Sequence, residues 1–408
     1  MSGNYIGIAG IAVILTIAVL LSTNRKAIRL RTVGAAFGLQ IAIAAFVLYL
    51  DWGKRMILAI SVAVQAVIDY SGAGIDMVFG ALASDSVGFS FAIHVLPVII
   101  FFSALMSVMY HLKIMQWVVK LVGGGLRTII GTGRVESLNA AANIFIGQTE
   151  SPLVIRPYLK SITEPQMFAI MVSGLASIAG TVLAGYVLMG AEMKYLLAAS
   201  FMAAPGGLLM AKIIMPDAES TPAADEGGEM EMEHSKHSNV ILAAAVGAHD
   251  GLKLAVNIGA MLIAFVALIA LFNGLVGGVA GLFGFEGVTL QKILGVIFQP
   301  LMFLLSVPWE EAQAAGSLFG EKLILNEFVA FSHLDYYLDG MSPRTVAVVT
   351  FSLCGFANLS SIAILLGGLG VLVPEKRELI ARFGLRAVAA ASLSNLMSAA
   401  LAGLLMTF

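Results

Sequence analysis

The sequence predicts an all-α polytopic membrane protein, with about eight transmembrane helices and two re-entrant hairpins arranged in inverted repeats. The first observation behind this prediction is composition. Of the 408 residues, 59% are hydrophobic and only 12% are charged, and the mean hydropathy is +0.94. A soluble chain of this length needs more polar surface than that. The second is a series of uncharged runs of helix length, and the third is a pair of short polar stretches within apolar sequence.

Basic residues orient the first helices. The apolar run at residues 6–22 can cross a bilayer and has no basic segment before it, so we expect a retained helix rather than a cleavable signal. The basic cluster after it belongs in the cytoplasm and places the N-terminus outside; it consists of Arg25, Lys26, Arg29 and Arg31. Residues 33–50 then return outward, and residues 56–68 have the pattern of an external interfacial helix.

The remaining spans follow the same rule. They are predicted at residues 91–110, 167–190, 195–211, 254–283, 345–373 and 387–408. Basic residues after the third span and before the last belong inside, so the C-terminus is also expected outside; they are Lys113, Lys120, Arg127 and Arg134, then Lys376, Arg377, Arg382 and Arg386. The acidic stretch 216–239 is predicted to be a solvated cytoplasmic linker.

Two copies of one pattern lie on either side of this linker. Each copy has a span, an amphipathic stretch (116–126 and 290–301), a segment with apolar runs too short to cross (136–158 and 310–338), and two more spans. Three crossings per copy make the second copy inverted relative to the first, which places a site between them near the membrane midplane. We expect the short segments to be re-entrant hairpins, with ordinary extramembrane loops as the alternative.

The polar stretches of the two copies each put a carboxylate at hydrophobic depth. Glu150 lies in the first, within residues 148–152, and Glu327 in the second, within residues 326–328. A carboxylate there costs at least about 2.5 kcal/mol, so two in matching places indicate a duplicated ligand site, and therefore a transporter. The alternatives are a transporter of another small polar solute, or a membrane enzyme that uses the two carboxylates as an acid and a base. No nucleophile elbow, HExxH or Walker A motif supports an enzyme, and we assign no catalytic residue.

Four motifs resemble the concentrative nucleoside transporter family. They are NIFIGQTE (143–150), SGLASIAG (173–180), NEFVA (326–330) and CGFANLSS (354–361). The resemblance covers nearly the whole chain and is closest to the short bacterial form. It implies a nucleoside and sodium symporter in a bacterial inner membrane, with the lipid bilayer but no nucleic acid as partner. It also implies a homotrimer in which a scaffold supports a transport domain that moves as an elevator.

The resemblance divides the chain into five parts. Residues 1–110 would be scaffold helices with an external interfacial segment, 111–215 the first repeat of the transport domain with its hairpin at 132–160, 216–239 the linker, 240–283 a scaffold helix with a preceding amphipathic segment, and 284–408 the second repeat with its hairpin at 305–338.

The resemblance also implies roles for individual residues. The nucleobase would meet Gln148, Thr149, Glu150 and Val182; the ribose would meet Glu327, Asn358 and Ser361, with Phe356 beside the ligand. Sodium would be held by the side chains of Asn143 and Ser177 and the carbonyl oxygens of Ile146 and Ile178. Some relatives couple to protons, so proton coupling stays the alternative. Without the family pattern, the favoured interpretation of Ser177 and Asn358 would be small polar residues that bond neighbouring helices; their positions in the family motifs reverse that preference.

Overall fold

The computed structural model describes residues 2–84, 88, 90–217 and 238–406, and these form helices and turns without strands. The first half contains α1 (Ser2–Leu20), α2 (Leu30–Leu48), α3 (Asp51–Asp69), α4 (Ser71–Phe79), α5 (Phe91–His94), α6 (Leu96–His111), α7 (Ile114–Ile130), α8 (Arg134–Ala142), the 3₁₀ helix η3 (Ser151–Tyr158), α9 (Glu164–Ala176), α10 (Gly180–Leu188) and α11 (Met193–Ile214). The second contains α12 (Val240–Leu282), α13 (Leu290–Leu304), α14 (Trp309–Ile324), α15 (Glu327–Ser332), α16 (Asp335–Leu338), α17 (Pro343–Leu353), α18 (Ser361–Leu372) and α19 (Arg377–Leu405).

Apolar helices of membrane-spanning length dominate the described chain. Seven such spans are found, at Leu30–Leu48, Asp51–Ala83, Phe91–His111, Glu164–Leu188, Met193–Ile214, Val240–Leu282 and Pro374–Leu405. The segments containing α9, α11 and α19 are mostly buried, whereas α12 is mostly exposed although it is at least as apolar; α6 is mostly half-buried. An exposed apolar helix is stable only against lipid or another protein surface. The molecule therefore has a protein-like core surrounded by membrane-facing helices.

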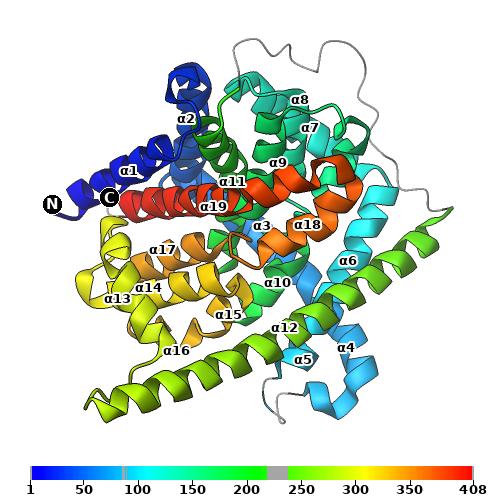
Figure 1. Ribbon diagram of the computed structural model, residues 1–408. Coiled ribbons are helices and arrows are strands. Elements are labelled where there is room, and N and C mark those ends of the chain that lie inside the picture. The colour runs from blue at the N-terminus through cyan, green and yellow to red at the C-terminus, as the bar shows by residue number, and fades with distance from the viewer. Residues whose placement is uncertain (1, 85–87, 89, 218–237, 407–408) are drawn as a thin grey trace.

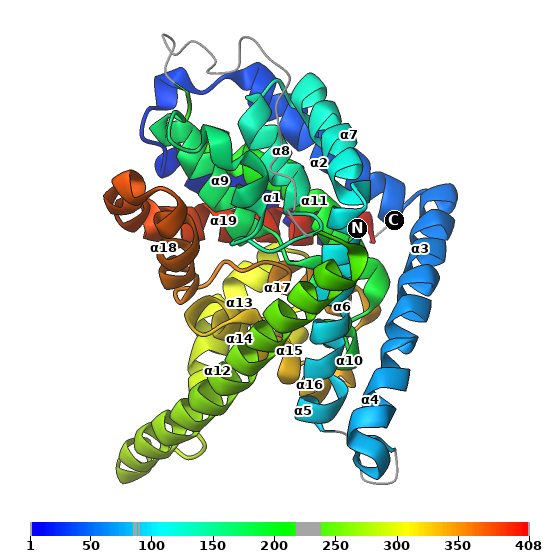
Figure 2. The same cartoon turned by 90° about the vertical axis from the view of Figure 1, so that its right-hand side faces the viewer.

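The exposed helix α12 runs diagonally across the molecule and packs along α6 (Figures 1 and 2). Two glycines allow close contact: a Cβ on Gly247 would lie 2.5 Å from Cβ of Ser107, and one on Gly251 would lie 2.7 Å from Cβ of Ser103. Ser107 also donates a hydrogen bond to the carbonyl of Ala243 at 2.7 Å. Small residues one turn apart on both helices are the usual means of tight packing in membranes.

Three predictions about helices need correction. The spans predicted at 167–190 and 345–373 are each broken, into α9 and α10 and into α17 and α18. The amphipathic segment expected before the span at 254–283 does not exist separately, because α12 is one helix of 43 residues. None of the half-helices has the roughly 20 residues needed to cross a bilayer alone. The two halves of each broken span therefore meet inside the core, where the backbone groups freed at the break need hydrogen-bond partners.

Both predicted hairpins are present as two helical arms joined by a buried turn, formed by α8 with η3 and by α14 with α15. Ile144 and Ile146 in the first turn are 5% and 6% exposed, and Asn326 in the second is 2% exposed. This burial is inconsistent with ordinary extramembrane loops.

The predicted interfacial segment lies within α3, whose exposed apolar side chains include Trp52 and Val62. In both views α19 runs nearly horizontally, whereas α3 runs steeply across that direction (Figure 2). Residues 51–83 are also long and apolar enough to span a bilayer, so the interfacial position of α3 stays a prediction.

The acidic linker was predicted to be solvated along its whole length, and one residue contradicts this. Asp217 is bonded to the buried Lys212 of α11 at 2.7 Å, and Lys212 also contacts Glu136 of the first hairpin at 2.5 Å. The side chains of Lys212 and Glu136 are 4% and 1% exposed. The start of the linker is thus part of a buried ion cluster that fastens α8 to α11. Residues 218–237 lie outside the described part of the chain.

Candidate functional site

The first hairpin turn is closed by Asn143. This residue follows the last turn of α8, donates to the carbonyl of Asn139 at 3.0 Å, and accepts from Ser151 Oγ, the first residue of η3, at 2.8 Å. One amide therefore joins the two arms. The predicted Glu150 lies at the end of the turn, with its carboxylate accepting from the backbone N–H of Gly147 at 2.9 Å. Its side chain is otherwise exposed, so it remains available to a ligand.

The second hairpin places its carboxylate differently. Asn326 caps α15 by accepting from the N–H of Val329 at 3.0 Å, which puts Glu327 in the first turn of that helix. Glu327 is only 3% exposed. Its Oε2 accepts from the amide of Asn358 at 3.0 Å, and its Oε1 accepts from the hydroxyl of Tyr186 at 3.3 Å. A buried carboxylate satisfied on both oxygens is held in one orientation.

Each helix break is bonded to the hairpin of its own copy. The N–H of Gly180, after the first break, donates to the carbonyl of Phe145 in the first hairpin at 3.0 Å. The N–H of Leu359, in the second break, donates to the carbonyl of Leu323 in the second hairpin at 3.1 Å. In both copies a backbone hydrogen bond thus holds the break to its hairpin, at neighbouring rather than identical positions of the matched motifs.

The breaks also contact each other. The N–H of Phe356 donates to the carbonyl of Ser177 at 3.2 Å. Gly355, just before it, has φ +152, a conformation that favours glycine, and a Cβ there would lie 2.4 Å from Asn395 Oδ1. The structure therefore brings the two copies of the motif into direct contact at the centre of the molecule.

The residues predicted to meet the nucleobase lie on the first hairpin and α10. Gln148 is buried against Gly174, whose Cβ would lie 3.0 Å from that of Gln148, and its Oε1 has no hydrogen-bond partner among the described residues. The side chain of Thr149 packs against Gly368 of α18, and Val182 is buried in the first turn of α10. Val182 and Tyr186 lie one turn apart on α10, so the bond from Tyr186 to Glu327 connects this set to the second carboxylate.

The residues predicted to meet the ribose cluster around the second break. Asn358 and Ser361 were both placed within the single span predicted at 345–373, and this is wrong: Asn358 lies in the break, and its Oδ1 accepts from the N–H of Ser361 at 2.9 Å as α18 begins. The two are nevertheless adjacent. Ser361 Oγ is buried without a hydrogen-bond partner among the described residues, and Phe356 lies half-buried beside them.

The residues predicted to hold sodium also lie together. A Cβ on Gly174 would be 3.9 Å from Asn143 Oδ1, and the carbonyl of Gly174 accepts from Ser177 Oγ at 3.1 Å. The carbonyls of Ile146 and Ile178 belong to the hairpin turn and the helix break that the bond from Gly180 to Phe145 joins. Neither of these two carbonyl oxygens accepts a hydrogen bond from a described residue, although both residues are buried.

Sequence reasoning missed three residues of this region. Lys322 is fully buried and donates to Asn395 Oδ1 at 2.8 Å and to the carbonyl of Ser352 at 3.0 Å. Asn395 in turn donates to the carbonyls of Ala176 and Cys354, the last residue of α9 and the first after α17, at 2.7 and 2.6 Å. A lysine and an asparagine within apolar helices were signals that could have found them. Nothing in the sequence marked the third, Tyr186.

This arrangement suits binding rather than catalysis. The side chains at the breaks are amides, hydroxyls and carboxylates, which donate to and accept from a polar ligand. None is paired as a nucleophile with a base in the described structure.

The chain matches the family models described as "Na+ dependent nucleoside transporter N-terminus" over residues 9–82, "Nucleoside recognition" over 92–193 and "Na+ dependent nucleoside transporter C-terminus" over 195–403.

Individual relatives match over nearly all of the chain. The uncharacterized transporter YutK of Bacillus subtilis is 52% identical over 98% of each chain, and the nucleoside permease NupC of Helicobacter pylori is 48% identical over 97% of this chain and 96% of its own. The sodium/nucleoside cotransporter 1 of Rattus norvegicus is 37% identical over 98% of this chain and 63% of its own.

Solved structures agree with these matches. CNTnw in an inward-facing substrate-bound state superimposes with a TM-score of 0.94 at 50% identity, covering 99% of this chain and 98% of that one. A doubly substituted CNTnw in an outward-facing state gives 0.96, again at 50% identity, over 100% and 98%. The chain therefore belongs to the concentrative nucleoside transporter family, whose members are membrane transporters and not enzymes.

Proposed function

We propose that this protein is a sodium-driven symporter that takes up nucleosides across a bacterial inner membrane. The observation that carries the proposal is the contact between the two helix breaks, each held to its own hairpin by a backbone hydrogen bond, from Gly180 to Phe145 and from Leu359 to Leu323. Broken helices that meet at the centre of a membrane protein present free backbone groups to a ligand. The names of the matched families support nucleosides as that ligand.

The ligand lies between the two copies in this proposal. Gln148, Thr149, Glu150 and Val182 contact the base, and Glu327, Asn358 and Ser361 contact the ribose, with Phe356 beside it. Support comes from the buried, unpartnered Gln148 Oε1 and Ser361 Oγ, because a polar atom buried without a partner is costly unless something binds it.

Sodium is bound by Asn143, Ser177 and the carbonyls of Ile146 and Ile178. These groups fit the ion because all four ligands are neutral oxygens, as a hard monovalent cation requires, and because the two buried carbonyls otherwise have no donor. When bound, the ion joins the first hairpin to the first helix break. Asn143 and Ser177 orient their oxygens for it through the bonds to Ser151 and Gly174.

The proposed assembly is a homotrimer with both termini external. The two copies form inverted repeats of the transport domain (111–215 and 284–408), which moves against the scaffold (1–110 and 240–283). Support comes from the exposed apolar side chains of α12, which need lipid or partner chains to cover them.

The test is uptake of labelled uridine and adenosine into proteoliposomes. We expect accumulation with an inward sodium gradient and recovery of chemically unchanged nucleoside from the lumen. If a proton gradient in choline drives the same accumulation, protons rather than sodium are the coupling ion. Recovery of a chemically modified nucleoside would contradict transport itself.

A further inference from the structure

A single buried hydrogen bond links α2 to α19 within the apolar core. Gln40 on α2 is 0% exposed, and its Nε2 donates to Ser398 Oγ on α19 at 2.9 Å. Its Oε1 has no hydrogen-bond partner among the described residues. In the proposed function α2 belongs to the scaffold and α19 to the transport domain, so this amide lies across the surface along which the two parts move.

A second serine lies one turn away on α19. Ser394 Oγ is buried and also has no hydrogen-bond partner among the described residues. A Cβ on Gly206 of α11 would lie 2.5 Å from Gln40 Nε2 and 2.6 Å from Ser394 Oγ, so the two polar atoms lie on either side of one point that only a glycine leaves free. Gln40 thus has its present partner and an unused one of the same chemistry within one turn.

Small residues flank Gln40 on α2, since Ala36 and Ala44 lie one turn before and one turn after it and are buried. On α19, the buried residue one turn before Ser398 is Ser394, and the buried residue one turn after it is Ala402. Along α19, a second hydroxyl therefore lies next to Ser398 on one side only.

A displacement by one helical turn, about 5.4 Å, would exchange the partners of Gln40. If α19 moves one turn along its own axis towards its C-terminal end, Ser394 takes the place of Ser398 beside Gln40. Movement the other way would bring Ala402 to Gln40 and leave a buried amide without a partner, which is unfavourable. The hydroxyl positions therefore favour one direction of movement.

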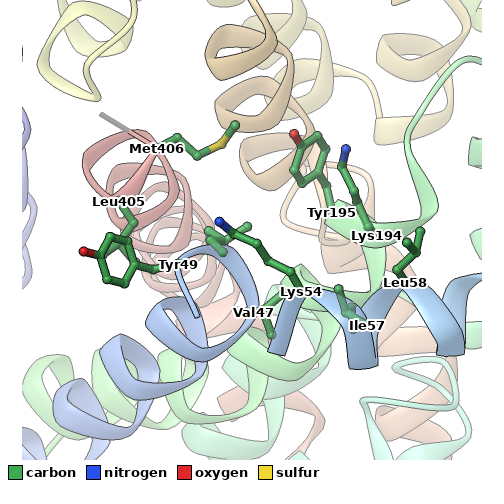
Figure 3. Close-up of a pocket in the computed structure, with 10 residues that line it drawn as sticks. Val47, Tyr49, Lys54, Ile57, Leu58, Lys194, Tyr195, Leu405 and Met406 are labelled. Carbon is green, nitrogen blue, oxygen red and sulfur yellow. The ribbon is translucent and has the colours of Figure 1, made fainter. Parts of the chain in front are cut away.

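Space for that movement exists at the C-terminal end of α19. A cavity of about 500 Å³ separates the ends of α11 and α19 from the corner between α2 and α3. Figure 3 shows Leu405 and Met406 of α19 and Tyr195 of α11 on one side of it, with Lys54 and Ile57 of α3 on the other. Close packing does not oppose displacement there.

We infer that Gln40 is a two-position contact of the transport cycle: it bonds Ser398 in this conformation and Ser394 after α11 and α19 have moved one turn towards the C-terminal end of α19. This inference rests on the proposed movement of the transport domain. Gln40 is a positioning residue, since it lies outside the ligand site and acts through the helices it joins.

Cross-linking tests the exchange directly. Cys354 is the only cysteine, so Cys354→Ala gives a cysteine-free background. Two pairs are made in it, Gln40→Cys with Ser398→Cys and Gln40→Cys with Ser394→Cys, each with a protease site between α11 and α12. Hg²⁺ then holds the two fragments together on a denaturing gel wherever the thiols meet. Gln40→Cys with Ala402→Cys is the matched control in the opposite direction.

We expect the cross-linking yields of the Ser398 pair and the Ser394 pair to change several-fold in opposite directions between buffer that contains sodium and uridine and buffer without sodium. The cross-linking yield of the control pair should stay low in both buffers. Yields that are unchanged, or that rise and fall together, would overturn the exchange. Uridine uptake by the cysteine-free background protein is measured separately, and sodium-independent uptake would contradict the proposed coupling. Opposite changes of the two cross-linking yields with uridine alone would still support the exchange.

A variant without cysteines provides a second readout. Gln40→Leu keeps the volume and removes both hydrogen bonds. We expect it to change the maximal rate of uridine uptake several-fold while leaving uridine binding in detergent unchanged. A purely structural role would instead lower binding and thermal stability together, and that result would contradict the inference.

Discussion

The side-chain amide of Asn358 donates a hydrogen bond of 3.0 Å to Glu327 Oε2, and this bond joins the second helix break to the second hairpin. The same amide accepts from the N–H of Ser361 through its oxygen. Asn358 therefore fixes both a carboxylate and a helix start, and a ligand that meets Glu327 meets an acceptor already held in place. The first carboxylate, Glu150, is bonded only to its own turn and lies exposed.

This difference predicts unequal effects of neutralising the two carboxylates. Glu327→Gln should weaken uridine binding by roughly 1.5–3 kcal/mol, tenfold or more in Kd, because it removes a charge-assisted acceptor that is held in place. Glu150→Gln should weaken binding less, because that side chain must first be ordered. Calorimetry on purified protein measures both. Glu310 is an exposed carboxylate on the same hairpin, so Glu310→Gln is the control. Unchanged uridine binding by Glu327→Gln would contradict the site assignment.

Sodium dependence should respond to the first hairpin and the first break. Asn143→Ala and Ser177→Ala should each raise the sodium concentration needed for half-maximal uridine binding. By linkage, uridine should then promote sodium binding less in these variants. Ser173→Ala, one turn earlier on α9, is the matched control. Equal binding by the unmodified protein in sodium and in choline at fixed pH is the result that rules sodium out.

Base and sugar recognition should separate between the two copies. Ser361→Ala should weaken uridine and adenosine by similar factors and narrow the difference between uridine and deoxyuridine, since its free hydroxyl lies in the proposed ribose region. Gln148→Ala should instead change the ratio of adenosine to uridine affinity. Competition with the three nucleosides measures this. The assignment is reversed if Ser361→Ala alters base preference and leaves sugar discrimination intact.

The buried ion cluster of Lys212, Glu136 and Asp217 predicts a stability effect outside the site. Lys212→Met leaves two carboxylates without their cation, and breaking a buried pair in this way costs about 3–5 kcal/mol. Adding Glu136→Gln to Lys212→Met should restore much of the loss. Thermal unfolding in detergent is the measurement. If the double variant is no more stable than the single one, the carboxylate is not the source of the loss.

The sequence predicted the helical class and the hairpins because long apolar runs and buried carboxylates are costly and therefore conspicuous. It failed at the helix breaks, where the backbone leaves the helical conformation although the sequence stays mostly apolar. Ser177 and Gly355 look like ordinary residues of an apolar span, yet the helices break there because the freed carbonyls find Asn395 and Phe356 far away in the chain. Asp217 was misjudged for the same reason, since its partner Lys212 is buried only in the folded chain.

The position of Asn395 has a consequence for how the protein is made. Its amide is the group that satisfies the end of α9 and the end of α17, and it lies on α19, which leaves the ribosome after both of them. Until α19 has inserted, both broken helices carry carbonyls without this donor at membrane depth. The centre of the transporter is therefore completed only once α19 is in place, and a chain truncated before residue 395 would leave the first repeat, fully translated long before, without its finished structure.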